Sequence, residues 1–106
     1  MKLVIPAVIE IGPLDISIVF SDTLMEKMND RASCNIKEQI IRLRSGTSTD
    51  QLFANLMHEV EHVVEDVAGI DTQEDNTIGR ANLLAQALLS MGIEPDFSQV
   101  PIEVVK

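Results

Sequence analysis

The sequence has few of the residues that several kinds of functional site require. Its 106 residues include one cysteine, two histidines, no tryptophan and no tyrosine. Cys34 has no partner for a disulfide within this sequence, and one thiol is too few for a zinc site made of cysteines. Because neither histidine is near it in the sequence, we expect Cys34 to be a small strand residue. Any metal site has to be built from histidine and carboxylate side chains.

Positive charge and long apolar runs are also scarce. Eight Lys and Arg residues stand against seventeen Asp and Glu residues, which gives a formal net charge of −9. This charge repels nucleic-acid phosphates and anionic lipid headgroups, so we expect neither nucleic acid nor a membrane as a partner. No apolar run approaches the roughly 20 residues that cross a bilayer, and no signal-peptide core follows Met1, so we expect a cytosolic (cytoplasmic) protein. With 45% apolar residues, the chain predicts a single domain spanning residues 1–106.

The first half of the chain has the patterns of β-strands. The β-rich runs 3–11 and 14–20 are joined at Gly12-Pro13, which predicts a β-hairpin. A short helix is predicted over 23–29. Apolar and polar residues then alternate over 35–43, the pattern of a half-exposed strand that suits a sheet edge.

The second half predicts two long helices. The first runs to about Ala68, with Thr49 or Asp50 at its N-cap and Gly69 at its end, and the second covers about 73–91. The order of elements predicts an α+β domain, in which both helices pack on one face of a small antiparallel or mixed β-sheet.

The first long helix carries both histidines. At about 100° per residue, its apolar side chains fall on one face and His58, Glu59 and His62 fall on the opposite side. Residues four apart have Cβ atoms about 5–6 Å from each other, so the two imidazoles can converge on one ion at about 2.0–2.1 Å. Glu59 is offset from His58 and can reach a water beside the ion. This spacing therefore predicts a metal site with two ligands and a general base.

An alternative interpretation is a solvated charged face with incidental histidines, since Glu61, Glu65 and Asp66 are also on this helix. Against it, the only two histidines of the chain occupy the required pair of positions, and a glutamate follows the first one.

Residues 55–65, which include His58-Glu59-Val60-Glu61-His62, resemble the active-site helix of the zincin metallopeptidases with its H-E-x-x-H motif. The similarity extends from about Ile36 to Leu89 and is closest to minimal gluzincin-like proteases and small phage-encoded metallopeptidases. It implies zinc-dependent peptide-bond hydrolysis by a zinc-bound water, with Glu59 as the general base. It also implies that a peptide or protein substrate is laid along the strand before the helix, residues 36–44.

A carboxylate is expected as the third ligand, because catalytic zinc sites usually have three protein ligands and one open position. Glu65 is about two turns from His58, too far along the helix to meet the same ion. Glu74 lies in line with the apolar stripe of the second helix, where a charge is costly unless it is paired or bound to metal. We predict Glu74, with Asp75 and then Asp71 as alternatives; the acids near this helix start could also be no more than favourable charges.

The sequence departs from the larger gluzincins in two respects. They carry an acid four residues after the third ligand, where this chain has Ile78, so a different residue must orient a histidine. Their usual transition-state donors are also missing, and Arg80 and Asn82 are the candidates that remain. A metal-binding regulatory or interaction module with little turnover is therefore the alternative function.

Overall fold

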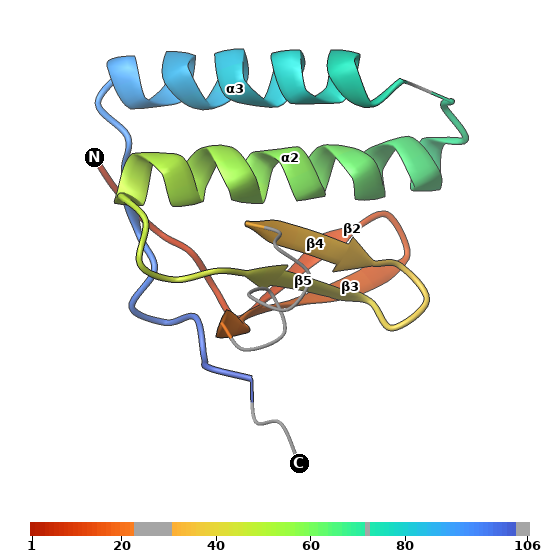
Figure 1. Cartoon of the computed structure of the whole chain (residues 1–106), viewed down its shortest axis with the longest axis horizontal. Coiled ribbons are helices and arrows are strands. Elements are labelled where there is room, and N and C mark those ends of the chain that lie inside the picture. The colour runs from red at the N-terminus through yellow and green to blue at the C-terminus, as the bar shows by residue number, and fades with distance from the viewer. Residues whose placement is uncertain (23–30, 72, 104–106) are drawn as a thin grey trace.

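The protein has three layers: a β-sheet, a helix on one face of the sheet, and a second helix on the first (Figure 1). This computed structural model describes residues 1–22, 31–71 and 73–103, without the side chain of Asp75, so the helix predicted over 23–29 lies outside the described residues. The strands are β1 (Lys2–Val4), β2 (Val8–Ile11), β3 (Leu14–Phe20), β4 (Ala32–Asn35), β5 (Ile40–Leu43) and β6 (Glu94–Asp96); the helices are α2 (Thr49–Ala68) and α3 (Glu74–Ser90).

The predicted α+β class and the mixed sheet are confirmed. The larger sheet has the strand order β2-β3-β5-β4, and β1 and β6 form a separate parallel pair. The predicted hairpin is present as β2 and β3, in which Ile11 is opposite Leu14. Gly12 at its turn has a φ of 57°, and a Cβ there would lie 2.7 Å from Cγ1 of Val67 on α2. The hairpin tip therefore approaches the end of α2 closely.

The prediction of a single strand over 35–43 is wrong, because this segment contains the end of β4, a turn and β5. Residues 36–39 form a turn, because the Asn35 side chain accepts from the backbone N of Glu38 (3.0 Å) and donates to its carboxylate (2.6 Å). The chain reverses there, so β4 and β5 pair antiparallel. β5 also pairs with β3, which corrects the expectation of a sheet edge at residues 36–44. Among the described strands, β4 is the edge of the sheet beside α2.

Helix α2 covers the sheet with its apolar face. The predicted helix is confirmed and ends at Gly69 in the left-handed region (φ 71°), but its N-cap is Ser48, whose hydroxyl accepts from the N of Gln51. Buried side chains of α2 and the sheet together form the core: Ile16, Ile18, Ile41, Leu43, Leu52, Phe53, Leu56 and Val63. Val64 and Val67, which we expected on the same face, are 41% and 38% exposed.

Helix α3 packs on α2, not on the sheet as we expected (Figure 1). Its buried positions are the small residues Thr77, Ala81 and Ala85, which allow a close approach to α2. Ile78 and Leu84 from the predicted apolar stripe are 42% and 41% exposed. The described part of α3 is therefore rotated relative to the expectation. No helix in the described ranges combines the length and apolar character that a membrane span needs.

Candidate metal centre

The two histidines of α2 lie side by side, with their Nε2 atoms 3.1 Å apart. The carboxylate of Glu59 lies 3.9 Å from Nε2 of His58. Ligand atoms of His58, Glu59 and His62 all lie within 4.8 Å of one another, so these residues could hold a metal ion. The helical spacing that suggested the site thus brings the three side chains together.

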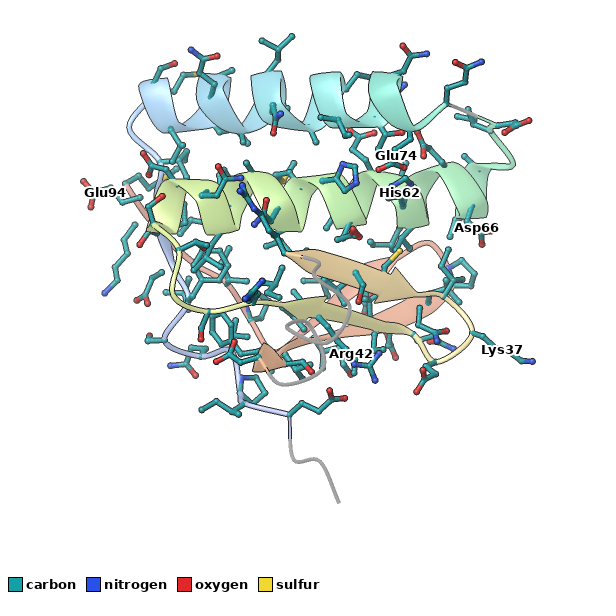
Figure 2. All side chains as sticks on the ribbon, in the orientation of Figure 1. Lys37, Arg42, His62, Asp66, Glu74 and Glu94 are labelled. Atoms are coloured by element: carbon teal, nitrogen blue, oxygen red, sulfur yellow. The ribbon has the colours of Figure 1, made fainter. Side chains whose placement is uncertain are left out.

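Glu74, from the first turn of α3, meets both histidines, and Figure 2 shows it next to His62. Its Oε1 lies 2.8 Å from Nε2 of His58, and its Oε2 lies 2.9 Å from Nε2 of His62. Ligands of a tetrahedral zinc ion with bonds of about 2.0–2.1 Å are about 3.3 Å apart, so a few tenths of an ångström of opening would fit the ion. Asp71 lies in the exposed connection between the helices.

The site is partly covered, which argues against a fully solvated charged face. Glu59 is 5% exposed and Glu65 is 7% exposed, because α3 and the sheet cover the helix on both sides. The side chain of Glu74 is 56% exposed, since the first turn of α3 lies at the end of the interface between the helices. The expectation that Glu74 sits on a buried stripe is therefore wrong, although its carboxylate does face the histidines. The acid-lined centre opens to solvent beside Glu74.

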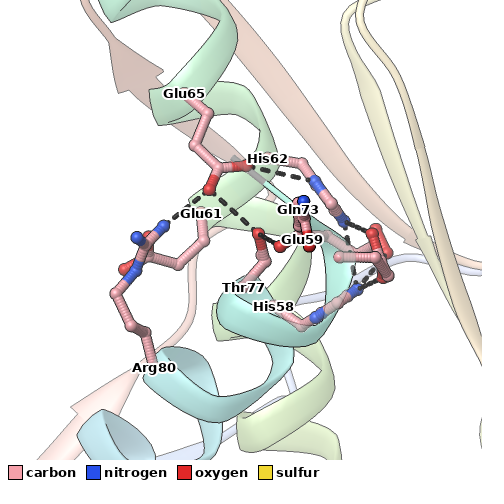
Figure 3. Close-up of polar contacts among 9 residues, drawn as sticks. His58, Glu59, Glu61, His62, Glu65, Gln73, Thr77 and Arg80 are labelled. Carbon is pink, nitrogen blue, oxygen red and sulfur yellow. Dashed lines mark hydrogen bonds and ion pairs between the residues drawn. The ribbon is translucent and has the colours of Figure 1, made fainter. Parts of the chain in front are cut away.

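A second set of polar contacts lies behind His62 (Figure 3). Oε1 of Glu65 is 3.4 Å from Nδ1 of His62, and Oε2 of Glu65 accepts from the hydroxyl of Thr77 (2.9 Å) and from Nη2 of Arg80 (2.5 Å). Arg80 also donates to Glu61 at 3.1 Å. Thr77 is completely buried. As expected, Glu65 does not reach the Nε2 side of the site; it contacts the other nitrogen of the ring.

The two candidate transition-state donors, Arg80 and Asn82, lie away from the histidines. The Arg80 guanidinium is bound to Glu61 and Glu65, behind the histidines. Asn82 lines a hollow between the first turns of α2 and the last turns of α3, with Gln51 and Gln86. Neither candidate points at the metal centre. Sequence reasoning missed Thr77 and the role of Glu65; a usable signal was the spacing of Glu74, Thr77 and Arg80, which recur every three residues along α3.

Cys34 on β4 connects the sheet edge with the site, and its position in a strand confirms the prediction. Burial raises the pKa of the Cys34 thiol to about 11, with further contributions from the charge of Glu59 and a hydrogen bond to it. The thiol is therefore neutral near pH 7. Its contact with Glu59 shows that β4 runs past the general-base candidate.

Comparison with family models, with curated proteins and with solved structures found no match to this chain. The zincin resemblance therefore rests on the motif residues and on the order of the elements around them.

Proposed function

We propose that the chain is a zinc-dependent peptidase in which His58, His62 and Glu74 hold the ion and Glu59 is the general base. The observation that carries the proposal is the convergence of two imidazole Nε2 atoms and one carboxylate, at separations of 3.1, 2.8 and 2.9 Å. Two nitrogens and one carboxylate are a typical ligand set of catalytic zinc, and this set leaves a fourth position open.

The charges around the histidines also favour a divalent cation. Glu59 and Glu74 both approach Nε2 of His58, at 3.9 and 2.8 Å. The Arg80 guanidinium from α3 is bound to Glu61 and Glu65. A metal ion between His58 and His62 would lie next to the carboxylates of Glu59 and Glu74, whose negative charges attract a cation.

The chain's own residues account for the proton transfers. When bound, zinc polarises the scissile carbonyl and lowers the pKa of the attacking water. Glu59 accepts a proton from that water and returns it to the leaving amine, and the rigid helix keeps its carboxylate beside His58. The retention of a base in this position favours catalysis, because a purely structural metal site needs none.

The peptide substrate would bind as an added strand along β4. It would not bind along residues 36–44 as we expected, because β5 lies inside the sheet between β3 and β4. The backbone N of Arg44 donates to the carbonyl O of Arg31 (3.0 Å), where β4 begins and β5 ends. Alternation along an antiparallel pair then directs the backbone groups of Ala32 and Cys34 away from β5, toward the edge. This edge passes Glu59, so a strand added there would bring a peptide bond to the base. The cytosolic location stays a prediction.

A metal-binding regulatory or interaction module is the second candidate. It is favoured by the contacts of Arg80 with Glu61 and Glu65, which leave this guanidinium unable to act as a transition-state donor. This candidate expects zinc binding without peptide cleavage.

Untagged protein incubated with zinc and a peptide library tests the two candidates. We expect cleavage by the wild type and a rate lower by about 10²–10⁴-fold in Glu59→Gln, with zinc retained in both. Asp66→Asn is the matched control, because it removes one exposed charge from the same helix, and its rate should stay at the wild-type level. Equal cleavage by Glu59→Gln and wild type would contradict the peptidase, and zinc uptake without cleavage would support the module.

A further inference from the structure

His62 has protein contacts at both ring nitrogens. Its Nε2 faces the metal centre, 2.9 Å from Glu74, and its Nδ1 lies 3.4 Å from Oε1 of Glu65. Glu65 follows His62 by three residues, about one helical turn, and is 7% exposed. A carboxylate with so little access to water is placed by its protein contacts, and not by solvent.

We infer that Glu65 is a positioning residue that fixes the orientation and the tautomer of His62. The Glu65 carboxylate lies on the Nδ1 side of the ring, which favours the proton on Nδ1 and leaves the Nε2 lone pair directed at the metal position. This inference rests on the proposed function and deepens it, because it assigns the residue that prepares one ligand.

Two donors from α3 hold Glu65 in place. The Thr77 hydroxyl and Nη2 of Arg80 both donate to Oε2, at 2.9 and 2.5 Å. With Oε2 taken by these donors, Oε1 is the oxygen that faces His62. Arg80 supplies the positive charge that makes a buried carboxylate tolerable. Helix α3 therefore contributes to the site twice. Glu74 lies at the metal position, and Thr77 and Arg80 hold Glu65 (Figure 3).

The contacts of His62 also favour a cation between the two histidines and Glu74. If Nδ1 of His62 carries the proton, its Nε2 presents a lone pair to a carboxylate oxygen of Glu74 at 2.9 Å and to Nε2 of His58 at 3.1 Å. Electron-rich atoms at these distances repel each other unless a proton or a metal ion lies between them. Glu65 thus biases His62 toward metal binding.

Zinc affinity of two matched variants tests the inference. Glu61 and Glu65 are both on α2 and both bind Arg80, but Glu65 is the one that contacts Nδ1 of His62. By competition with a chelating dye, Glu65→Gln should bind zinc about 10–100-fold more weakly than the wild type. Glu61→Gln should stay within about threefold, as an Arg pair at the surface contributes little. Equal affinities for Glu65→Gln and wild type would overturn the inference and leave the proposed function standing.

Nitrogen-15 NMR of the zinc-loaded protein gives a second readout that a loss of packing would not mimic. The Nδ1–H proton of His62 should be a downfield, slowly exchanging resonance, lost in Glu65→Gln and kept in Glu61→Gln. If Glu65→Gln does not fold, Thr77→Val keeps the carboxylate but removes one donor to it, and should weaken zinc binding several-fold. An unchanged affinity in Thr77→Val together with an exposed, fast-exchanging Nδ1–H in the wild type would overturn the inference. A wild type that takes up no zinc would overturn the proposed function and this inference with it.

Discussion

Helix α2 has two covered faces that are built from opposite kinds of residue. The face on the sheet carries Leu52, Phe53 and Leu56, all at most 8% exposed. The face beneath α3 carries His58 and His62, with Glu65 behind them. Burial of each large apolar side chain stabilises the fold by about 1.5–3 kcal/mol, whereas each buried charged group needs a partner to be tolerated at all. The comparison teaches that stability comes mainly from the sheet side, whereas the proposed metal centre lies on the α3 side.

The largest expected effect is on the sheet side. Phe53→Ala should lower the free energy of unfolding by about 3–5 kcal/mol, because the ring is 2% exposed in the core and its removal leaves a cavity. His58→Ala in metal-free protein should cost less than Phe53→Ala, because the imidazole is 19% exposed and the Glu74 carboxylate in contact with it is 56% exposed. Urea unfolding of both variants without zinc measures the difference. Equal losses would contradict the division between the two faces.

Zinc should stabilise the folded chain through the α3 side alone. At a free zinc concentration of about 100 times the Kd, binding adds about 2.7 kcal/mol to the free energy of unfolding. His62→Ala and Glu74→Ala should lose most of this increment, while Leu52→Ala should keep it despite a lower starting stability. Thermal unfolding with and without zinc measures each increment. An undiminished increment in His62→Ala would place the ion elsewhere.

Cys34 reports on the charge of Glu59, at the border between the two faces. Burial and Glu59 both raise the pKa of this thiol, to about 11, and therefore keep it protonated. Glu59→Gln removes the charge, so the pKa should fall and alkylation of metal-free protein by iodoacetamide at pH 8 should accelerate several-fold. Asp66→Asn should accelerate it less, because Asp66 contributes less to the shift. The pH dependence of the alkylation rate gives the pKa directly, and an unchanged rate in Glu59→Gln would separate Cys34 from the site.

The smallest expected effect is at an ion pair on β5, remote from the histidines in the sequence. Nε and Nη2 of Arg42 donate to the Glu103 carboxylate at 3.0–3.2 Å, which lowers the pKa of Glu103 from 4.5. A lowered carboxylate pKa contributes stability above about pH 4.5 that is lost as the pH falls through the lowered value. Glu103→Gln should cost about 0.2–1 kcal/mol at pH 7 and nothing once Glu103 is protonated in the wild type.

Urea unfolding at pH 7 and at a series of lower pH values checks this, and zinc affinity at pH 7 should be unchanged. A loss that grows as the pH falls, or a change in zinc affinity, would contradict this assignment.

The histidine helix could be predicted from the sequence because its residues are neighbours on one helix. His58, Glu59 and His62 need only the helical repeat to come together. Glu74 could be proposed as a ligand because the chain has no third histidine. The exposure of its side chain could not be predicted, since it depends on where α3 starts relative to α2.

Two features could not be predicted: the packing of α3 on α2, and the strand that forms the edge of the sheet. Thr77, Ala81 and Ala85 face α2, and small residues give a weak apolar pattern that points to the wrong stripe. The contact of Glu65 with Thr77 and Arg80 joins two helices, so no local spacing on α2 indicates it. The turn after Asn35 could not be recognised in the sequence, because apolar and polar residues alternate through it as they do in a strand.

The metal centre itself is tested most directly by anomalous scattering at the zinc edge, measured on a crystal of the untagged, zinc-loaded chain. We predict one ion per chain, bound by Nε2 of His58, Nε2 of His62 and a carboxylate oxygen of Glu74, with the Glu65 carboxylate beside Nδ1 of His62. An ion held without the two histidines, an ion bound by Asp75 in place of Glu74, or no ion at all would contradict this prediction.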